Sequence, residues 1–224
     1  MKTIIKALVF DAYGTLFDPL SVASLCDELY PGHGSALSQL WRSRQLEYTW
    51  LRSLMGRYED FWKVTEAALV FASRTLGLPC ESPARERLMQ AYLSLKPFPE
   101  VPDALRALRG YPLCILSNGT REMLRVVVKN SGLEDVFWQV ISVEEARIYK
   151  PSPRAYELAA RKMGAEPGAI GFVSSNFWDA AGAKAFGFFT CWVNRTNAQS
   201  EELGFVPDAT GRSLTELAQM LTRA

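Results

Sequence analysis

The sequence predicts an α/β protein in which a doubly wound parallel sheet is interrupted by an all-helical insertion. Short apolar segments alternate with helical patterns in residues 1–15 and from about 98 to 224, as in parallel sheets with helices on both faces. Residues of about 18–96 show helical periodicity and no strand pattern. We therefore expect a Rossmann-like core, residues 1–17 with 97–224, and a helical cap (lid), residues 18–96, inserted after the first strand.

The expected strands are short apolar runs bounded by polar or turn residues. They are Ile4–Phe10, Leu113–Leu116, Val140–Ser142, Ile170–Val173 and Phe188–Val193. The expected helices of the core are Val101–Arg109, Glu122–Ser131, Pro153–Met163, Asp179–Phe186 and Leu214–Leu221. For the third of these, Ser152 before Pro153 is an N-terminal signal and Gly164 is a stop signal.

The insertion contains three helical patterns. The first has its apolar residues at Leu37, Leu40, Trp41, Tyr48, Leu51 and Met55. The second runs from Phe61 to Leu76 before Gly77, and Ser82-Pro83 opens the third. Because ligands of open α/β sheets bind at the carboxyl ends of the strands, an insertion after the first strand is placed to cover that edge. The alternative is a helical bundle that has no part in catalysis.

Composition narrows the function classes. Of 224 residues, 48% are hydrophobic and the net charge is +1, so the chain can build a large core and has no basic tract for nucleic acid or a membrane. We expect no signal peptide, because Lys6 and Asp11 interrupt the first apolar stretch, and no transmembrane helix. Four widely spaced cysteines indicate reduced thiols and a cytoplasmic protein.

His33 is the only histidine of the chain. It lies in the sequence Pro-Gly-His-Gly, which is typical of a turn, and we interpret it as a solvated loop residue. A catalytic triad or a histidine-rich zinc site would have to be built on this one residue, and we expect neither.

The strongest chemical signal is Asp11, which directly follows the first expected strand and precedes Gly14 and Thr15. A carboxylate at the carboxyl end of a buried strand is well placed to act as a nucleophile. Further polar segments lie near the ends of later strands or open a helix: Ser117-Asn118-Gly119, Lys150-Pro151 and Ser174 to Asp179.

In order and strand context these segments resemble the motifs of the haloacid dehalogenase superfamily. The cap sequences Leu40-Trp41-Arg42 and Gln45 to Leu51, with Tyr149-Lys150-Pro151, resemble the bacterial (S)-2-haloacid dehalogenases over nearly the whole chain. The resemblance implies hydrolysis of short L-2-haloalkanoic acids to D-2-hydroxyalkanoic acids and halide, with neither metal nor organic cofactor. It also implies a homodimer, for which the apolar residues Trp50, Leu51 and Leu54 are candidates if they are not core.

The resemblance assigns the first half of the reaction to a few residues. Asp11 attacks the halogen-bearing carbon and forms a covalent ester. Lys150 keeps Asp11 charged, although before a proline it could be a surface lysine. Further hydrogen bonds orient the carboxylate oxygens, from Thr15, Ser174 and Asn176.

Two anions must also be bound. Arg42, Asn118 and the edge of Trp178 are candidates to stabilise the departing halide, and Arg42 could alternatively form a structural ion pair. The substrate carboxylate needs donors, and the candidates are the Ser117 hydroxyl and the main-chain N–H groups of Ala12, Tyr13 and Ser117.

The remaining roles concern the ester and the apolar wall. Asp179 is the candidate that positions or deprotonates water, or it serves the dipole of its helix. Tyr156 is expected to orient Lys150, or to pack on the sheet. The wall around the halogen and the alkyl chain is expected from Tyr13, Leu46, Phe61 and Trp178, with simple cap packing as the alternative for Leu46 and Phe61.

Two rival functions remain in view. A magnesium-dependent phosphatase of the same superfamily would need a second carboxylate two residues after Asp11, and the chain has Tyr13 there. A non-catalytic binding protein should have lost Asp11, Lys150 or Arg42, and all three are present. Ser43, where the dehalogenases usually have glutamine, bears on substrate preference.

Overall fold

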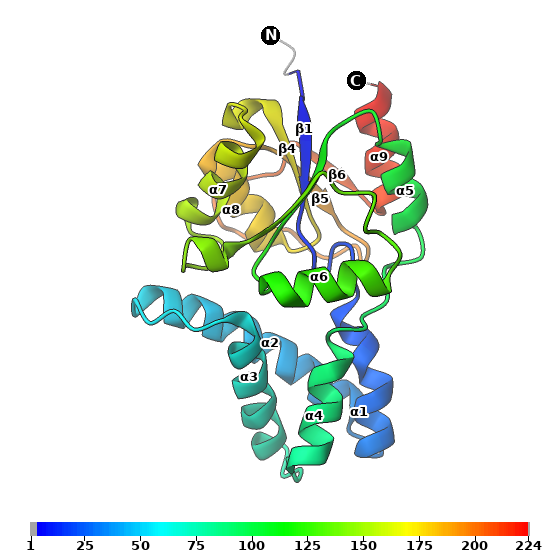
Figure 1. The fold of residues 1–224 in the computed structure, drawn as a ribbon, viewed down its shortest axis with the longest axis vertical. Coiled ribbons are helices and arrows are strands. Elements are labelled where there is room, and N and C mark those ends of the chain that lie inside the picture. The colour runs from blue at the N-terminus through cyan, green and yellow to red at the C-terminus, as the bar shows by residue number, and fades with distance from the viewer. Residues whose placement is uncertain (1–3, 224) are drawn as a thin grey trace.

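The structure is a computed structural model that describes residues 4–223. It consists of a sheet flanked by helices, called the core below, and a group of four helices, called the cap, which lies below one edge of the sheet in Figure 1. Residues 1–3 and 224, which belong to the predicted core range, lie outside the described residues.

Within residues 4–223, six parallel strands form one sheet in the order β3-β2-β1-β4-β5-β6. Their bounds are β1 Ala7–Phe10, β2 Leu113–Ser117, β3 Gln139–Ser142, β4 Ile170–Ser174, β5 Phe189–Val193 and β6 Ala209–Gly211. The parallel sheet confirms the predicted fold class. All residues of β1, β2 and β4 are buried, as expected for central strands covered on both faces.

The strands differ from the prediction at both ends of the chain. β1 begins at Ala7, where it first pairs with β4, and Ile4 before it is 76% exposed. An apolar residue outside the strand pairing is thus not part of the core. β6 was not predicted because its three residues, Ala-Thr-Gly, contain no apolar run.

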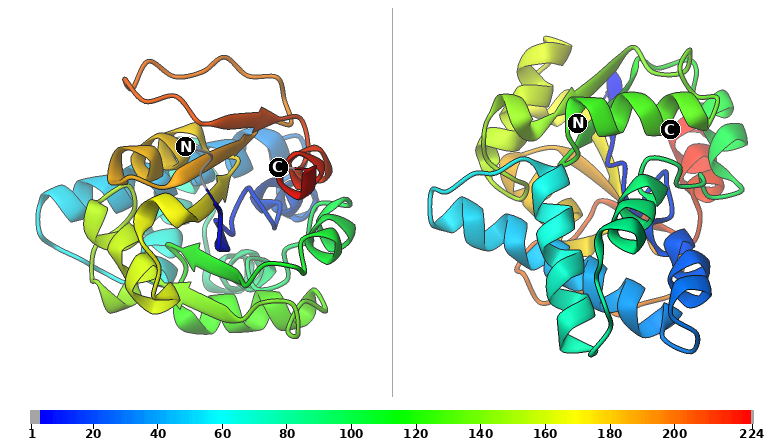
Figure 2. Two further views of the ribbon diagram at one scale, coloured as in Figure 1. Left: turned by 90° about the horizontal axis from the view of Figure 1, so that it is seen from above. Right: turned by 60° about the horizontal axis from the view of Figure 1, so that its bottom comes forward.

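Five helices belong to the core: α5 Val101–Ala107, α6 Arg121–Asn130, α7 Pro153–Met163, α8 Phe177–Phe186 and α9 Leu214–Arg223. Helices α7 and α8 pack together on one face of the sheet, and α5 and α9 pack together on the other (Figure 2). Helix α7 has Pro153 in its first turn and ends at the left-handed Gly164, as predicted. Helix α8 begins two residues earlier than predicted, which places Asp179 in its first turn.

The cap consists of α1 Ala23–Leu29, α2 Gly34–Leu54, α3 Phe61–Thr75 and α4 Ser82–Ala91. Short 3-10 helices occur at Pro19–Val22 before α1, and at Val143–Glu145 and Pro167–Ala169 in the core. Helices α2 and α3 pack against each other, and the buried Trp41 donates its indole N–H to the carbonyl of Thr65 at 2.8 Å. His33 is exposed, in agreement with the solvated position predicted for it.

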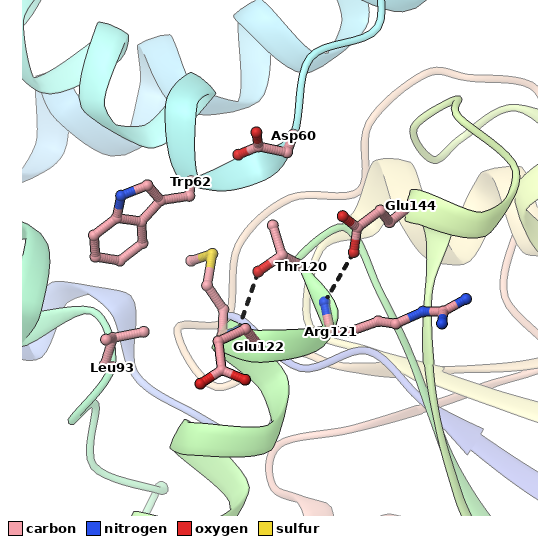
Figure 3. Close-up of a pocket in the computed structure, with 8 residues that line it drawn as sticks. Asp60, Trp62, Leu93, Thr120, Arg121, Glu122 and Glu144 are labelled. Carbon is pink, nitrogen blue, oxygen red and sulfur yellow. Dashed lines mark hydrogen bonds between the residues drawn. The ribbon is translucent and has the colours of Figure 1, made fainter.

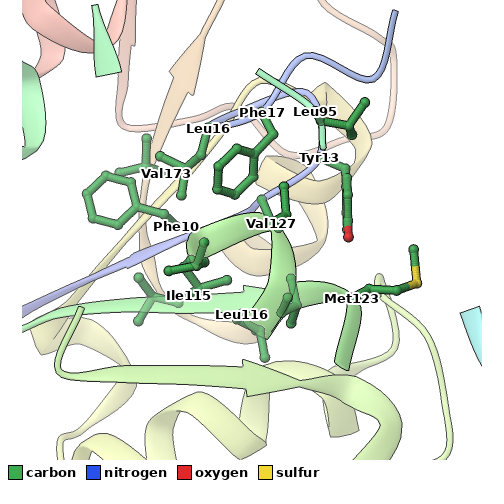
Figure 4. Close-up of a cluster of buried hydrophobic side chains, with 14 of the residues drawn as sticks. Phe10, Tyr13, Leu16, Phe17, Leu95, Ile115, Leu116, Met123, Val127 and Val173 are labelled. Carbon is green, nitrogen blue, oxygen red and sulfur yellow. The ribbon is translucent and has the colours of Figure 1, made fainter. Parts of the chain in front are cut away.

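The two chain segments that join cap and core run side by side. The main-chain N–H of Asp18 donates to the carbonyl of Lys96 at 3.0 Å, and that of Phe98 donates to Leu16 at 3.0 Å. The buried cluster beneath them is continuous with the sheet: Phe10, Leu16, Phe17, Tyr13, Ile115 and Val173 belong to it (Figure 4). Within residues 4–223, no helix combines the length and apolarity needed to cross a bilayer.

Candidate active site

The first residue of the site follows the end of β1. Asp11 is 5% exposed, and its main-chain N–H donates to the carbonyl of Val173 at 2.9 Å, which fixes it at the carboxyl edge of the sheet. The turn that follows requires a positive φ of 98° at Gly14, a conformation that favours glycine. The Asp-x-x-Gly-Thr sequence therefore builds a tight turn that brings Thr15 back to Asp11.

Three side chains hold the Asp11 carboxylate. Oδ1 accepts from Lys150 Nζ at 2.8 Å, and Oδ2 accepts from Asn176 Nδ2 at 2.9 Å and from Thr15 Oγ1 at 3.0 Å. The Thr15 hydroxyl itself accepts from the main-chain N–H of Ser175 at 2.8 Å, so its single proton is directed to Asp11. Both oxygens are thus oriented by hydrogen-bond donors.

Lys150 is only 1% exposed, which rules out the alternative that it is a surface lysine. Its Nζ lies between two carboxylates, 2.8 Å from Asp11 Oδ1 and 2.7 Å from Asp179 Oδ2, and also donates to the carbonyl of Leu116 at 3.1 Å. Burial by itself would lower the pKa of Lys150, but the two carboxylates outweigh burial and its pKa is raised. Lys150 therefore stays charged.

Asp179 is completely buried on the other side of Lys150. Its Oδ1 accepts from the Tyr156 hydroxyl at 2.8 Å, and its Oδ2 accepts from Ser174 Oγ at 3.0 Å in addition to Lys150. Burial, and to a smaller degree the charge of Asp11, raise the pKa of Asp179 to about 6 against the opposing effect of Lys150. This carboxyl group can exchange a proton near neutral pH.

Two predicted contacts were wrong. Tyr156 was expected to orient Lys150, but its hydroxyl bonds to the side chain and the carbonyl of Asp179. Ser174 was expected to orient Asp11, and it too bonds to Asp179. Both differences have one cause. Asp179, in the first turn of α8, is the carboxylate within reach of α7 and β4, which carry Tyr156 and Ser174.

A small closed pocket adjoins the Asp11 carboxylate. It has a volume of about 10 Å³, and its lining consists of Asp11, Tyr13, Arg42, Leu46, Phe61, Ser117, Asn118, Asn176 and Trp178. Each of these residues was predicted as a site residue. The volume is close to that of a single water site.

Arg42 connects the cap to the nucleophile turn. From α2 its Nη2 donates to the carbonyl of Tyr13 at 3.0 Å, and its Nη1 donates to Gln45 Oε1 at 2.7 Å. Within residues 4–223 Arg42 has no carboxylate partner, so the alternative of a structural ion pair does not hold. A guanidinium group that is not neutralised by a carboxylate lines a pocket beside Asp11.

The rest of the pocket wall is largely aromatic. The rings of Tyr13 and Phe61 lie 5.8 Å apart, and Gly119 leaves room for Tyr13 because a Cβ there would come within 2.7 Å of its ring. Burial raises the pKa of Tyr13, so its phenol stays neutral. Trp178 packs edge to face on Trp50 at 5.4 Å, and Trp50 is thus a neighbour of the site that the sequence analysis assigned only to packing or dimerisation.

The predicted anion donors lie on the turn after β2. Ser117 is buried and its Oγ accepts from the N–H of Gly119 at 3.2 Å, while Asn118 Oδ1 accepts from the main-chain N–H of Lys150 at 3.0 Å. Both residues line the pocket. The side chain of Ala12 is fully buried and does not, so only its main chain is available to a ligand.

Arg195 supports the nucleophile turn from outside and was missed. Its guanidinium donates to the carbonyls of Gly14 at 3.2 Å and Thr15 at 2.9 Å and to Ser175 Oγ at 2.7 Å, and it stacks on the ring of Phe98 at 3.8 Å. The signal was present in the sequence, because Arg195 lies two residues after the last predicted strand, at the same edge of the sheet as Asp11.

A wider crevice of about 580 Å³ separates the cap from the core at the start of α6 (Figure 3). Asp60 and Trp62 line it from the cap, and Thr120, Glu122 and Glu144 line it from the core. It contains none of the predicted site residues, and so its size does not make it the reaction site.

The chain is similar to known proteins over most of its length. A family model described as haloacid dehalogenase-like hydrolase matches residues 5–187. The chain is 51% identical over 222 residues to an (S)-2-haloacid dehalogenase of Pseudomonas sp. (strain YL), covering 98% of this chain and 96% of the relative. It is 51% identical over 208 residues to haloacetate dehalogenase H-2 of Moraxella sp. (strain B), covering 92% and 93%.

Solved structures of L-2-haloacid dehalogenases are also similar to this chain. An L-2-haloacid dehalogenase superposes with a TM-score of 0.96 at 48% identity, covering 98% of this chain and 100% of that one. The L-2-haloacid dehalogenase of Xanthobacter autotrophicus with chloropropionic acid covalently bound superposes with a TM-score of 0.93 at 41% identity, covering 98% and 99%.

Proposed function

This chain belongs to the haloacid dehalogenase-like hydrolases, and from that premise we propose how its residues cleave the carbon–halogen bond of short L-2-haloalkanoic acids. The enzyme is a hydrolase acting on carbon–halide bonds, and its products are the D-2-hydroxyalkanoic acid and halide. The observation that carries the proposal is the Asp11 carboxylate, oriented by Lys150, Thr15 and Asn176 and adjoining a small pocket with aromatic walls.

In the first step Asp11 attacks C2 of the substrate from the side opposite the halogen. A carbon–oxygen bond forms to the carboxylate as the carbon–halogen bond breaks, and the electron pair of the broken bond leaves with the halide. The product of this step is an ester on Asp11, with inverted configuration at C2. The ammonium group of Lys150 lies 2.8 Å from Asp11 Oδ1 and orients the nucleophile.

The departing halide requires positive charge where it forms. Arg42, which has no carboxylate partner within residues 4–223, meets this need, with the amide of Asn118 and the ring edge of Trp178 beside it. The substrate carboxylate is assigned to the Ser117 hydroxyl and to the main-chain N–H groups of Ala12, Tyr13 and Ser117. Leu46 and Phe61 surround the alkyl chain.

In the second step water attacks the carbonyl carbon of the ester. Asp179 accepts a proton from the water and returns it to the alkoxide oxygen that leaves, so the hydroxy acid departs with the oxygen that came from Asp11. The Asp11 carboxyl group, which now holds the oxygen of the water, loses its remaining proton to solvent and is again a carboxylate. The pKa of about 6 suits Asp179 to this exchange near neutral pH. Tyr156 and Ser174 are positioning residues for Asp179, to which both donate hydrogen bonds.

The magnesium-dependent phosphatase is the alternative function. Two features of the site oppose it. The phenol of Tyr13 occupies the position of the second acid, and the ammonium group of Lys150 lies between Asp11 and Asp179, where a metal held by both carboxylates would have to bind. Within residues 4–223, no group of three or more histidine, cysteine, aspartate or glutamate side chains is arranged to hold a metal ion.

A screen of halide release from both enantiomers of 2-chloropropionate, with and without a chelator, tests the function. We expect release from the L enantiomer that a chelator does not change, and none from Asp11→Asn. Phosphatase activity that disappears with the chelator would favour the alternative. A single turnover in oxygen-18 water should place the label in Asp11, whereas label that appears directly in the hydroxy acid contradicts the ester route.

Three further assignments belong to this proposal. Residues 18–96 act as a lid that excludes water, since Arg42, Leu46 and Phe61 of this segment line the closed pocket. The protein is a homodimer, and the exposed Leu51 and Leu54, 43% and 85% accessible, are candidates for its interface.

The protein is cytoplasmic, which its four free cysteines support. Light scattering of the wild type and of Leu54→Lys tests the dimer, and cell fractionation tests the location.

A further inference from the structure

Three arginines meet outside the reaction site, between the C-terminal end of α2 and the loop that precedes Lys150. Arg52 and Arg57 come from the cap and Arg147 comes from the core, and with Gly56, Tyr58 and Glu59 they line a cavity of about 600 Å³. We call this cavity the arginine basin. None of its residues lines the pocket beside Asp11.

Within residues 4–223, no carboxylate lies within salt-bridge distance of the three arginines, although Arg52 and Arg147 contribute, after Lys63, to lowering the pKa of Glu59. Within the described residues 4–223, the guanidinium groups of Arg52, Arg57 and Arg147 form no ion pair and donate no hydrogen bond to a protein group. The one carboxylate of the lining, Glu59, already pairs with Lys63 at 3.0 Å. Other arginines on this surface do have partners, such as Arg161, which pairs with Glu145 at 3.2 Å.

The backbone of Arg147, which is exposed, has an unusual conformation. Its φ of 50° lies in the left-handed region, which a side chain other than glycine or asparagine rarely adopts. This conformation places the guanidinium over the ring of Tyr58, 5.5 Å from the ring centre. Burial raises the pKa of Tyr58 to about 12, so its phenol is neutral and adds no negative charge to the basin.

We propose that the arginine basin is a second anion site, which binds a multivalent oxyanion of the phosphate type. Guanidinium groups present planar pairs of donors that match the oxygens of such an anion, and three of them together favour a multivalent anion over a singly charged carboxylate or halide. Because Arg52 and Arg57 belong to the cap and Arg147 to the core, the bound anion bridges the two parts.

The bridge reaches the reaction site through packed aromatic rings. The ring of Tyr58 lies 5.0 Å from that of Tyr149, and the ring of Tyr149 lies 6.2 Å from that of Phe61, which lines the closed pocket. Tyr149 directly precedes Lys150. An anion that joins Arg147 to the end of α2 therefore holds the cap against the segment that carries the lysine of the site.

Calorimetric titration of the whole protein with inorganic phosphate, at an ionic strength held constant with sodium chloride, tests the proposal without any turnover. We expect one phosphate per chain in the wild type. Arg147→Gln and Arg57→Gln should each weaken binding by about tenfold, because each removes a charged donor. Arg106→Gln, which removes an exposed arginine paired with Asp103 on α5, should leave it unchanged.

Asp11→Asn separates the basin from the reaction site and from the function proposed above. The variant should bind phosphate as the wild type does, even though it releases no halide. Binding that is lost in Asp11→Asn would place phosphate at the nucleophile and overturn the proposal. The proposal is also overturned if phosphate binds no better than chloride, or if only one of Arg57 and Arg147 affects its affinity.

Discussion

The core side and the cap side of the reaction site are built in different ways. On the core side, Asp11, Lys150 and Asp179 form a buried chain of charges in which every contact is 2.7–2.8 Å long and other donors hold the remaining carboxylate oxygens. On the cap side, Arg42 reaches the core through one hydrogen bond to a carbonyl and is held within the cap by a second one to Gln45. The core holds the nucleophile through buried ion pairs, and the cap contributes part of the pocket wall and the guanidinium group of Arg42.

This difference has an energetic reason. Buried charges are tolerated only when each one is paired, so removal of one member of the core chain leaves its partners unpaired and affects the whole fold. Arg42 on the cap is only partly buried and, within residues 4–223, has no carboxylate partner that its removal would leave unpaired. Changes on the core side should therefore alter both stability and chemistry, whereas changes on the cap side should alter chemistry alone.

The largest effect is expected for Lys150→Met, which leaves two carboxylates buried without their cation. The free energy of unfolding should fall by about 3–5 kcal/mol, and halide release should be lost. Urea denaturation measures the first effect and a halide assay the second. Lys184→Met is a matched control, because Lys184 pairs with Asp208 at the surface, and it should cost at most about 1 kcal/mol.

A triple variant makes this test more specific. Adding Asp11→Asn and Asp179→Asn to Lys150→Met removes the unpaired charges, and most of the lost stability should return although activity does not. If the triple variant is as unstable as Lys150→Met alone, the loss comes from packing around residue 150 and the comparison between core and cap is wrong.

Arg42→Ala tests the cap side. We expect kcat to fall by about 10²–10³-fold, as for the loss of one donor to a developing anion, while the unfolding midpoint stays close to that of the wild type. Arg44→Ala, two residues along α2 in a salt bridge with Glu47, should leave kcat unchanged. Near-normal turnover of Arg42→Ala would remove this residue from the mechanism.

The pH dependence of turnover should report Asp179. Its pKa is raised to about 6, so the folded protein holds this proton more tightly than the unfolded chain does. The contribution of Asp179 to stability is therefore present at low pH and is lost as the pH rises toward about 6. Turnover needs the ionised form, so kcat should rise with increasing pH and reach half its maximum near pH 6.

Tyr156→Phe tests this assignment. The hydroxyl of Tyr156 donates to the Asp179 carboxylate and lowers its pKa, so the acidic limb of the kcat profile should move upward by about one pH unit. Tyr111→Phe, whose hydroxyl bonds to Leu221 far from the site, should not move the limb. If the acidic limb of the kcat profile is unchanged in Tyr156→Phe, that limb reports the ionisation of a group other than Asp179.

The sequence predicted which residues gather at the site more reliably than how they pair. Strand ends of a parallel sheet meet at one edge, and this rule alone brings Asp11, Ser117 and Asn176 together. The rule does not say which carboxylate a hydroxyl on a neighbouring helix will reach, and the partners predicted for Tyr156 and Ser174 were wrong for that reason.

Elements with weak patterns were missed altogether. The three residues of β6 become a strand only by pairing with β5, a tertiary interaction that leaves no apolar run in the sequence. Arg195 was overlooked because it follows its strand without a motif around it, although its guanidinium holds the turn of Gly14 and Thr15. In both cases the structural role depends on distant segments of the chain.

The smallest effect is expected where cap and core meet, at Tyr13. Within residues 4–223, its buried hydroxyl has no hydrogen-bond partner, and in Figure 4 it points toward the side of Met123. Tyr13→Phe removes a polar group that costs free energy to bury, so the free energy of unfolding should rise by about 1 kcal/mol while kcat is unchanged. Tyr30→Phe, which loses a hydrogen bond to the carbonyl of Pro79, should instead destabilise the protein by a similar amount.

The two outcomes for Tyr13 have different consequences for the comparison. If stability rises and turnover is unchanged, the Tyr13 side chain only lines the pocket. The polar groups that take part in the reaction are then the buried ion pairs of Asp11, Lys150 and Asp179, together with Arg42. A fall in kcat of tenfold or more, about 1.4 kcal/mol of transition-state stabilisation, would mean that the phenol donates to the halide or to the substrate carboxylate in the enzyme with bound substrate. The core turn would then share with the cap the task of binding the anion that leaves.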